Sequence, residues 1–366
     1  MNSLYKLAKT ALFRFTPEQA HHIIMSNLDW ITQLGVHKLV TRPVPEDPIN
    51  VMGIRFPNCV GLAAGMDKDG EHVTAFGALG FGSVEIGTVT PKGQPGNPKP
   101  RCFRLVEDDA ILNRMGFNNV GAIQVAKNLQ SARAFRNRGG ILGVNIGKNK
   151  VTPNDLAIDD YMKCMDRLYM SGDYIAINIS SPNTPNLRDL QAEEELNKLL
   201  AAIAAKRKEL KAANKDHYVP IAVKLAPDLS DDGIKKALDV IVENGMDGVI
   251  CTNTTISREA ILGHPLEKEP GGLSGRPLME RSTEVTRLTS EHLRGTLPII
   301  ASGGVMSASD AVEKMEAGAS IVQLYTGFIF EGPELVADCV QAIAQWRANH
   351  QTSCPVSEPS SPSPAP

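Results

Sequence analysis

Apolar runs recur along the chain at intervals that suit alternating strands and helices. Eight short runs rich in Val, Ile and Leu have the composition of buried parallel strands, at residues 59–65, 83–89, 141–147, 174–180, 221–227, 248–254, 298–304 and 320–327. Each is separated from the next by a segment long enough for a helix. The pattern predicts an α/β fold, a closed (β/α)8 or TIM barrel. A doubly wound open sheet is the alternative, but the first run does not end in a glycine-rich dinucleotide turn.

Two helical patterns precede the first strand. Apolar residues recur at helical spacing over residues 4–15, with basic residues among them. A capping box from Thr16 to Gln19, with Pro17 at the first helical position, starts a second helix that ends at Gly35. Two such amphipathic helices can pack on the barrel or lie in a membrane interface. The pattern alone favours packing, because most amphipathic helices face a core.

The ends of the chain differ in composition from its middle. Residues 1–40 form the predicted helical extension, and residues 41–48, with three prolines, form a linker into a barrel over residues 49–350. Residues 351–366 are rich in Ser and Pro and lack the apolar side chains that could offset the entropy of ordering. We expect this last segment to be a disordered tail.

Composition and charge exclude several classes of protein. The 366 residues are 42% hydrophobic and carry a net charge of −3, which argues against nucleic acid as the main partner. The six cysteines include no C-x-x-C pair, so we expect reduced thiols in a cytosol-facing protein, and no metal site. No stretch stays apolar for the roughly 18 residues that cross a bilayer, and no cleavable signal peptide is evident. Any membrane contact is therefore expected to be peripheral.

Small polar groups gather where the predicted strands end. Active sites of barrels lie at the carboxyl ends of the strands, so Asn178, Ser181 and Asn183 after the fourth run are the first candidates. One such amide usually satisfies backbone groups. Four asparagines together with two lysines better suit a small, planar, amide-bearing anion: Asn145, Asn178, Asn183, Asn253, Lys68 and Lys224.

Other segments at the same end favour a phosphate group and a covering loop. A glycine-rich stretch at 271–277 follows the sixth run, and the glycine-rich turns at 302–305 and 325–327, at the ends of the seventh and eighth runs, are typical of the phosphate cup of these barrels. The Pro/Gly-rich residues 92–100 are typical of a binding loop or lid. The polar run that follows at 113–119 fits a binding site or only a network of turns.

Five motifs occur in the order found in one enzyme family. They are Ala-Ala-Gly-Met-Asp-Lys at 63–68, Asn-Arg-Met-Gly-Phe-Asn at 113–118, Asn-Ile-Ser-Ser-Pro-Asn at 178–183, Gly-Gly-Leu-Ser-Gly at 271–275 and Ala-Ser-Gly-Gly-Val at 301–305. Over residues 1–345 the chain resembles the dihydroorotate dehydrogenases, specifically the quinone-dependent, membrane-associated class. The soluble class has Cys at the position of Ser181 and lacks the paired N-terminal helices.

The resemblance implies an activity and a set of site residues. The reaction is oxidation of (S)-dihydroorotate to orotate in de novo pyrimidine (UMP) biosynthesis, with one FMN per chain, a membrane quinone (ubiquinone or menaquinone) as final acceptor, and Ser181 as catalytic base. The residues implied for FMN are Ala64, Gly65, Met66, Asp67, Lys68, Thr88, Asn145, Asn178, Lys224, Thr252, Gly275, Gly304, Tyr325 and Thr326. Those implied for dihydroorotate are Lys68, Asn113, Arg114, Met115, Gly116, Phe117, Asn178, Asn183, Asn253 and Thr254. Those implied for the quinone are His21, Arg104 and Tyr325.

The resemblance also changes the interpretation of the N-terminal helices. It implies an apolar funnel that admits a quinone, in a peripheral membrane protein on the cytoplasmic face of the cell membrane. The alternatives are a related FMN barrel that reduces dihydropyrimidines or dihydrouridine, a flavin-free lyase or isomerase of sugar phosphates, and a non-catalytic membrane-surface module. The first is not supported by any Fe–S cysteine run or basic RNA-binding extension.

Overall fold

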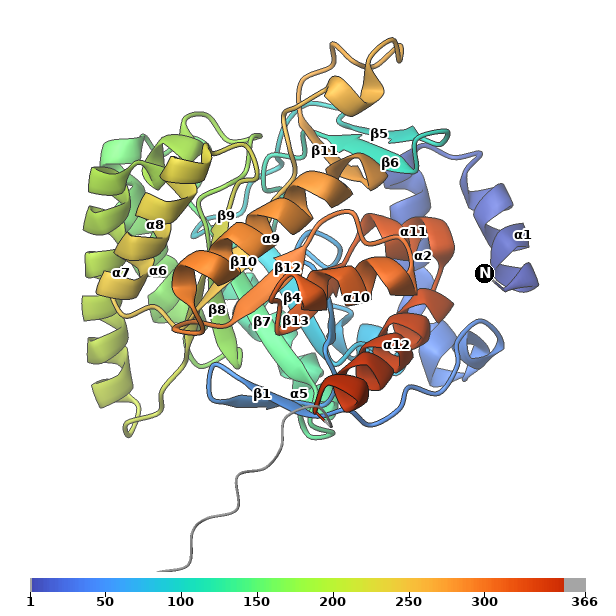
Figure 1. Cartoon of the computed structure of the whole chain (residues 1–366), viewed down its shortest axis with the longest axis horizontal. Coiled ribbons are helices and arrows are strands. Elements are labelled where there is room, and N and C mark those ends of the chain that lie inside the picture. Colours follow the sequence, from blue (N-terminus) through green and yellow to red (C-terminus); the bar gives the residue numbers. More distant parts are fainter. Residues whose placement is uncertain (1, 352–366) are drawn as a thin grey trace, which may run out of the picture.

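The computed structural model describes residues 2–351, so the predicted tail lies outside the described residues except for Gln351. Eight parallel strands close into a barrel in the order β3-β4-β7-β8-β9-β10-β12-β13 and back to β3 (Figure 1). Their bounds are β3 Val60–Leu62, β4 Ser83–Val89, β7 Ile141–Ile146, β8 Tyr174–Asn178, β9 Ile221–Leu225, β10 Gly248–Cys251, β12 Ile299–Ser302 and β13 Ile321–Leu324. Each lies within one of the eight predicted runs, which confirms the barrel.

Helices follow the strands and cover the outside of the barrel. They are α3 Val73–Ala78, α4 Ala122–Asn128, α5 Arg133–Arg136, α6 Ala157–Leu168, α7 Glu193–Ala213, α8 Asp231–Glu243, α9 Met279–Leu293, α10 Ala308–Glu316, α11 Thr326–Glu331 and α12 Glu334–Gln351. Short 3-10 turns are η1 Val36–Leu39, η2 Leu129–Ala132, η3 Asn154–Leu156, η4 Leu187–Gln191, η5 Glu259–Ile261 and η6 Arg276–Leu278. The barrel strands face helices on one side and the barrel interior on the other, so they carry few polar residues.

A hairpin closes the end of the barrel at which the strands begin. β1 Ile49–Val51 pairs antiparallel with β2 Ile54–Phe56. Val51 and Phe56 pack against interior side chains of the strands, among them Tyr174 and Ile250. The sequence prediction missed this hairpin, because two runs of three residues are too short to show a period.

A second small sheet lies at the opposite end. β5 Cys102–Leu105, β6 Ala110–Asn113 and β11 Gly272–Gly275 form an antiparallel sheet in the order β11-β6-β5. Within the glycine-rich stretch at 271–277, residues 272–275 pair with a strand more than a hundred residues earlier, a pairing that the sequence did not predict. In Figure 1 this sheet sits above the barrel, near the N-terminal helices.

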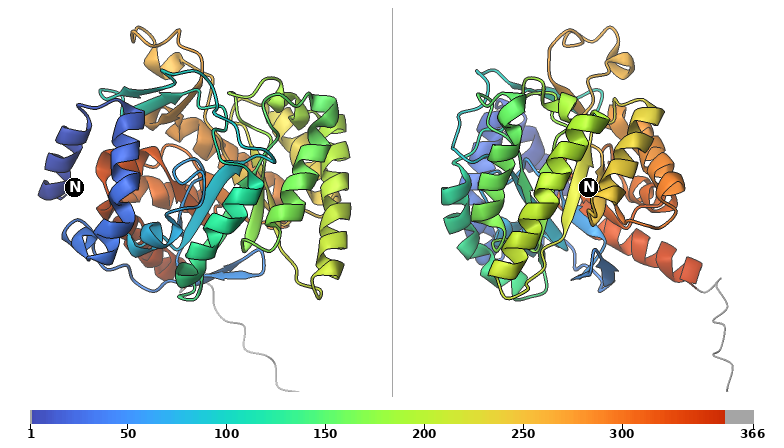
Figure 2. Two further views of the ribbon diagram at one scale, coloured as in Figure 1. Left: turned by 180° about the vertical axis from the view of Figure 1, so that it is seen from behind. Right: turned by 90° about the vertical axis from the view of Figure 1, so that its left-hand side faces the viewer.

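The two N-terminal helices, α1 Ser3–Leu12 and α2 Pro17–Gln33, lie on the side of the barrel opposite α7 (Figures 1 and 2). The predicted capping box is confirmed, with Thr16 accepting from the backbone of Gln19. Met25 and Leu28 of α2 are buried in the main core. α1 has no buried residue, and Leu7 is 70% exposed. Among the described residues no helix has the length and apolar character needed to cross a membrane.

Candidate active site

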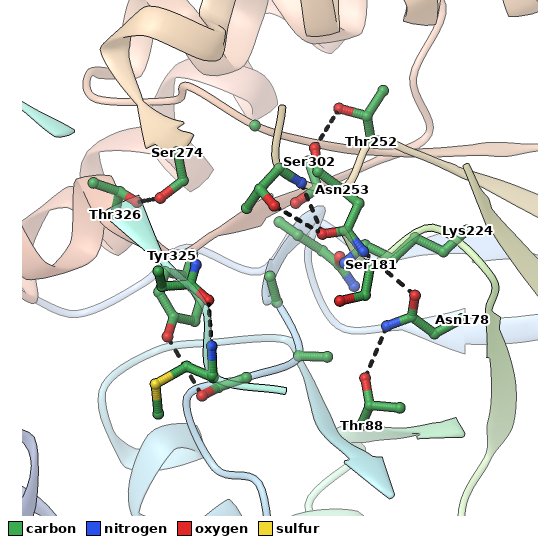
Figure 3. A pocket seen from close by; sticks show the side chains of 18 of the residues that line it. Thr88, Asn178, Ser181, Lys224, Thr252, Asn253, Ser274, Ser302, Tyr325 and Thr326 are labelled. Atoms are coloured by element: carbon green, nitrogen blue, oxygen red, sulfur yellow. Dashed lines mark hydrogen bonds between the residues drawn. The ribbon is translucent and has the colours of Figure 1, made fainter. Parts of the chain in front are cut away.

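An open cavity lies at the carboxyl ends of the barrel strands (Figure 3). The structure brings most of the predicted site residues to its wall: Ala64, Gly65, Lys68, Thr88, Asn113, Met115, Gly116, Phe117, Asn178, Ser181, Asn183, Lys224, Thr252, Asn253, Thr254, Gly275, Gly304, Tyr325 and Thr326. They come from loops and strand ends distributed around the barrel, so the fold alone assembles them.

Two lysines line the cavity. Lys224, the last residue but one of β9, is only 6% exposed, and Lys68 follows β3. Within the described residues neither ammonium group makes an ion pair or a hydrogen bond to the protein. Burial lowers the pKa of both groups, and for Lys224 the carboxylate of Glu85 opposes this shift. Two such cations favour a bound anion.

A chain of hydrogen bonds runs through the amide side chains under the cavity. Nδ2 of Asn253 donates to Oδ1 of Asn178 at 3.3 Å, and Nδ2 of Asn178 donates to Oγ1 of Thr88 at 2.8 Å. The Thr88 hydroxyl donates in turn to Oδ1 of Asn145 at 2.6 Å. Figure 3 shows Asn178 between Thr88 and Asn253. The chain fixes which amide atoms face the cavity, because each group has its donor and acceptor roles assigned by the next.

Ser181 lies at the cavity wall in the turn after β8. Its hydroxyl oxygen accepts a hydrogen bond from the backbone N–H of Asn183 at 3.2 Å. The side chain is buried and close to Asn178, as Figure 3 shows. An N–H donor on the hydroxyl oxygen stabilises negative charge there, whereas burial alone disfavours it.

The far side of the cavity offers backbone N–H groups. Residues 303–305 follow β12, and among the described residues their N–H groups donate no hydrogen bond to the protein, although Gly304 and Val305 are buried. Gly304 adopts a φ of 76°, and a side chain there would collide with the backbone of Met279. Thr326 at the start of α11 shares a hydrogen bond of 2.9 Å with Ser274. Free backbone donors in a glycine turn are typical of phosphate sites.

Four predicted ligand residues lie behind the cavity wall, namely Met66, Asp67, Arg114 and Asn145. The Asp67 carboxylate accepts from the backbone N–H groups of Glu71 and His72 at 3.0 and 2.8 Å, so it orders the turn after β3. Arg114 pairs with Glu269 at 2.6 Å and ties two loops together. The Asn145 side chain accepts a hydrogen bond from Thr88 and donates one to Glu85. These side chains support residues of the wall.

The three residues predicted to contact a quinone lie near the N-terminal helices but not in one cluster of polar contacts. Nε2 of His21 is 2.9 Å from the carbonyl oxygen of Met66, so Nε2 carries the proton and donates. Burial lowers the pKa of His21 to about 4. Nη1 of Arg104 donates to the carbonyl of Phe15 at 2.9 Å. Of the three, Tyr325 lines the cavity, and its hydroxyl donates to the carbonyl of Gly65 at 3.4 Å.

Sequence reasoning missed several residues of the site. Gln323 lines the cavity from β13 and is 2% exposed, and Glu85 lies buried beneath it in β4. The signal that could have found them is a polar residue in the interior of an otherwise apolar strand, which is costly to bury unless it has a partner. Leu278 was missed as well, whereas the remaining wall residues lie within strand ends or glycine-rich stretches that the sequence indicated: Ala63, Gly87, Ser274, Ser302, Gly303, Val305 and Gly327.

Comparison with known proteins agrees with this geometry. The family model described as dihydroorotate dehydrogenase matches residues 48–346. Proteins named dihydroorotate dehydrogenase (quinone) from Chromobacterium violaceum and Teredinibacter turnerae are 52% and 53% identical to the chain, covering 94% and 93% of it and 98% and 99% of their own lengths. A crystal structure of the Eimeria tenella enzyme in complex with ferulenol superposes with a TM-score of 0.83 at 37% identity, covering 94% of this chain and 96% of that one. The chain therefore belongs to the dihydroorotate dehydrogenase family.

Proposed function

We propose that this chain oxidises dihydroorotate to orotate in the cavity at the strand ends, and that a membrane quinone is the final electron acceptor. The observation that carries the proposal is the convergence of Ser181, the two unpaired lysines and the ordered amide chain on one cavity. The site offers a proton acceptor, cations for an anionic substrate and cofactor, and oriented amides for a pyrimidine ring. Relatives named dihydroorotate dehydrogenase (quinone), which align with nearly the whole chain, support the assignment.

The residues on the wall fit FMN as the cofactor. Lys224 is a buried cation without a protein partner, suited to the electron-rich pyrimidine edge of a flavin, and residues 303–305 with Thr326 are suited to its phosphate. Bound FMN would supply a hydride acceptor, which no side chain can provide. Ala64, Gly65 and Thr252 would hold its ring system, and Gly275, Gly304 and Tyr325 would hold its phosphate. Asn145, Met66 and Asp67 support the site from behind the wall.

Dihydroorotate is proposed to bind between the amides and the loop at residues 113–117. Lys68, together with backbone groups around Gly116, is suited to the carboxylate. Asn113, Asn178, Asn183, Asn253 and Thr254 supply the donors and acceptors that a cyclic ureide requires. Nδ2 of Asn183 lies 3.4 Å from Oδ1 of Asn113, so the two side chains hold each other across the site. Arg114 acts on the loop through its pair with Glu269.

Ser181 is proposed to be the base that accepts the proton from carbon 5 of dihydroorotate. A serine hydroxyl is a weak base in water, so the site must favour its deprotonation. The backbone N–H of Asn183, 3.2 Å from Oγ, stabilises negative charge on that oxygen. Burial of Ser181 by itself disfavours an anionic oxygen, so this N–H donor must offset part of that cost.

The N-terminal helices are proposed to admit the quinone and to attach the protein peripherally to the cytoplasmic face of the cell membrane. Exposed apolar side chains gather on them and on the turn that follows: Leu4, Leu7, Phe15, Ile23, Ile24, Trp30, Leu34, Val36 and Leu39. A cluster of this kind suits insertion into the interfacial layer of a bilayer. His21, Arg104 and Tyr325 are the proposed polar contacts of the quinone head.

An anaerobic absorbance experiment tests the proposal. The purified protein should show the two visible bands of an oxidised flavin, and adding dihydroorotate should bleach them while orotate appears in equal amount. Extraction should yield FMN. The matched control is the Ser181→Ala protein prepared in the same way, which should carry the same flavin and bleach far more slowly. A colourless protein, or a flavin that dihydroorotate leaves oxidised, would refute the proposal.

A further inference from the structure

Glu85 is a buried carboxylate to which the proposed function gives no role. It lies in β4 beneath the cavity and is 0% exposed. Its Oε1 accepts from Nδ2 of Asn145 at 2.8 Å, and its Oε2 accepts from the Tyr174 hydroxyl and from Nε2 of Gln323, each at 2.8 Å. In the described part of the chain it takes part in no ion pair. A packed apolar side chain would avoid the desolvation of a charge, so this arrangement requires an explanation.

The carboxylate sets the direction of the amide chain above it. An ionised carboxylate can only accept hydrogen bonds, so the NH₂ group of Asn145 must face Glu85 and its Oδ1 must face Thr88. The Thr88 hydroxyl has one hydrogen, which it donates to Asn145, so Thr88 must accept from Asn178. Each role follows from the one below it, and Glu85 is the group that cannot reverse.

The direction of this hydrogen-bond chain determines whether Asn178 offers a donor or an acceptor to the cavity. Its NH₂ group gives one hydrogen to Thr88 and keeps one, while its Oδ1 accepts from Asn253 and from the Ser180 hydroxyl, both at 3.3 Å. One N–H hydrogen of Asn178 therefore remains free, whereas its carbonyl oxygen already accepts hydrogen bonds from Asn253 and Ser180. With the chain reversed, Asn178 would turn its carbonyl oxygen toward Thr88 and its NH₂ group toward Asn253.

Glu85 orients a second amide in the same way. Gln323 gives its Nε2 to the carboxylate, so its Oε1 must point elsewhere. That oxygen is buried and has no hydrogen-bond partner among the described residues, although Gln323 lines the cavity. Glu85 thus assigns the donor and acceptor sides of two amides that line the cavity: Gln323 directly, and Asn178 through Asn145 and Thr88.

We propose that Glu85 is a positioning residue for the reaction, whose acceptor-only carboxylate sets the hydrogen-bond direction from Asn145 through Thr88 and Asn178 to Asn253 and so presents an N–H donor of Asn178 to the pyrimidine. This role rests on the proposed function, because it concerns the same substrate. It adds a residue that does not touch the cavity and that acts only through others.

Replacing Glu85 by Gln tests the inference while keeping shape. A glutamine can donate or accept toward Asn145, so the chain is free to adopt both directions. In the Glu85→Gln flavoprotein we expect the orotate Kd to rise about tenfold and the rate of flavin reduction by dihydroorotate to fall about 10- to 100-fold. Reoxidation of the reduced protein by quinone should stay within about twofold of wild type. Equal orotate affinity and reduction rate in wild type and variant would overturn the inference.

Two further variants separate direction from other effects of a buried charge. Asn145→Leu breaks the chain but keeps the carboxylate, so it should reproduce both defects, and the double variant should add little to either single one. Tyr174→Phe removes a donor to Oε2 without touching the chain, so orotate affinity should be preserved. Normal orotate affinity in Asn145→Leu, or a defect in Tyr174→Phe as large as that in Glu85→Gln, would overturn the inference.

The set of variants also distinguishes an error in the inference from a variant that does not fold and from an error in the proposed function. If Glu85→Gln does not fold, the Asn145→Leu result decides alone. If dihydroorotate does not reduce the wild-type protein, the proposed function fails. Reduction of wild type together with unimpaired variants rejects only the role of Glu85.

Discussion

The hydroxyl oxygen of Ser181 accepts the backbone N–H of Asn183 at 3.2 Å, across the proline between them. The turn that follows β8 thus carries both the proposed base and a donor that stabilises its deprotonated form. Asn183 also reaches Asn113 on the facing loop. The same short segment therefore carries the proposed base and contacts the opposite wall of the cavity.

Removing the hydroxyl should separate binding from chemistry. In Ser181→Ala we expect flavin content and orotate affinity close to wild type, and flavin reduction slower by about 10²- to 10⁴-fold, because only the proton acceptor is lost. Anaerobic stopped-flow absorbance measures the rate. A reduction rate near wild type would remove Ser181 from the mechanism.

Replacing the hydroxyl by a thiol should change the pH dependence. A thiol ionises far more readily than an alcohol, so Ser181→Cys should keep partial activity and reach its maximal reduction rate at a lower pH than wild type. The measurement is the rate of flavin reduction across the pH range in which both proteins stay folded. A profile that coincides with that of wild type would show that the group at position 181 does not titrate in the rate-limiting step.

Lys224 should control retention and potential of the cofactor. Its ammonium is buried, has no protein partner in the described chain and faces the cavity. Replacing it by Ala should weaken FMN binding and make the midpoint potential more negative, because a cation that favours the reduced, anionic form is lost. Lys163→Ala, which removes an exposed lysine on α6, is the matched control. Full occupancy and an unchanged potential in Lys224→Ala would place that lysine outside the flavin site.

His21 should make the fold sensitive to mild acid. Burial lowers its pKa from 6.5 to about 4, so the unfolded chain binds the proton more tightly than the native state does. Its contribution to stability is complete above about pH 6.5 and is lost as the pH falls toward 4. His21→Gln can keep a donor to the carbonyl of Met66 but does not titrate, so its Tm should fall less than that of wild type over this window. Parallel Tm curves would contradict this assignment.

The exposed apolar side chains of the N-terminal helices should carry membrane binding. Leu7 on α1 and Trp30 on α2 are 70% and 62% exposed, so replacing both by Glu should not disturb the core. We expect co-sedimentation with anionic vesicles and turnover with a long-chain quinone to fall at least about tenfold, since burial of two large apolar groups is lost. Flavin reduction by dihydroorotate should be unchanged.

A matched control lies elsewhere on the surface. Leu262, between η5 and β11, is 75% exposed, and Leu262→Glu should leave vesicle binding intact. Point substitutions are preferable to deleting residues 1–40, because Met25 and Leu28 belong to the main core. Equal vesicle binding by the Leu7/Trp30 variant and wild type would return these helices to a role in packing alone.

The sequence predicted the barrel and most of the cavity wall, because both depend on local signals. A buried parallel strand is an apolar run, and its carboxyl end is where the run stops, so Asn178, Ser181 and Lys224 could be placed without knowing the pairing. The antiparallel sheet was not predictable in the same way. β11 pairs with β6 through contacts between residues 272–275 and 110–113, and nothing local in four residues that include two glycines marks a strand.

The sequence also could not predict whether a given side chain lines the cavity or lies beneath its wall. Asn145 and Asn178 both lie near the carboxyl ends of neighbouring strands, but Asn145 pairs with Ala176, so Asn178 lies two residues further along and lines the cavity while Asn145 lies beneath it. Whether a side chain contacts a ligand or supports one that does depends on the tilt of the strands and on long-range partners such as Glu85. These partners appear only when the barrel is closed.

A single-turnover measurement of both half-reactions tests most directly whether electrons pass from dihydroorotate through the flavin to a quinone. The holoenzyme is reduced anaerobically with one equivalent of dihydroorotate and then mixed with vesicles that contain a long-chain quinone, and orotate, quinol and the flavin spectrum are quantified at each step. We predict one orotate formed as the flavin bleaches, followed by one quinol formed as the flavin colour returns. Orotate that does not appear, or a reduced flavin that the quinone fails to reoxidise, would contradict the assignment.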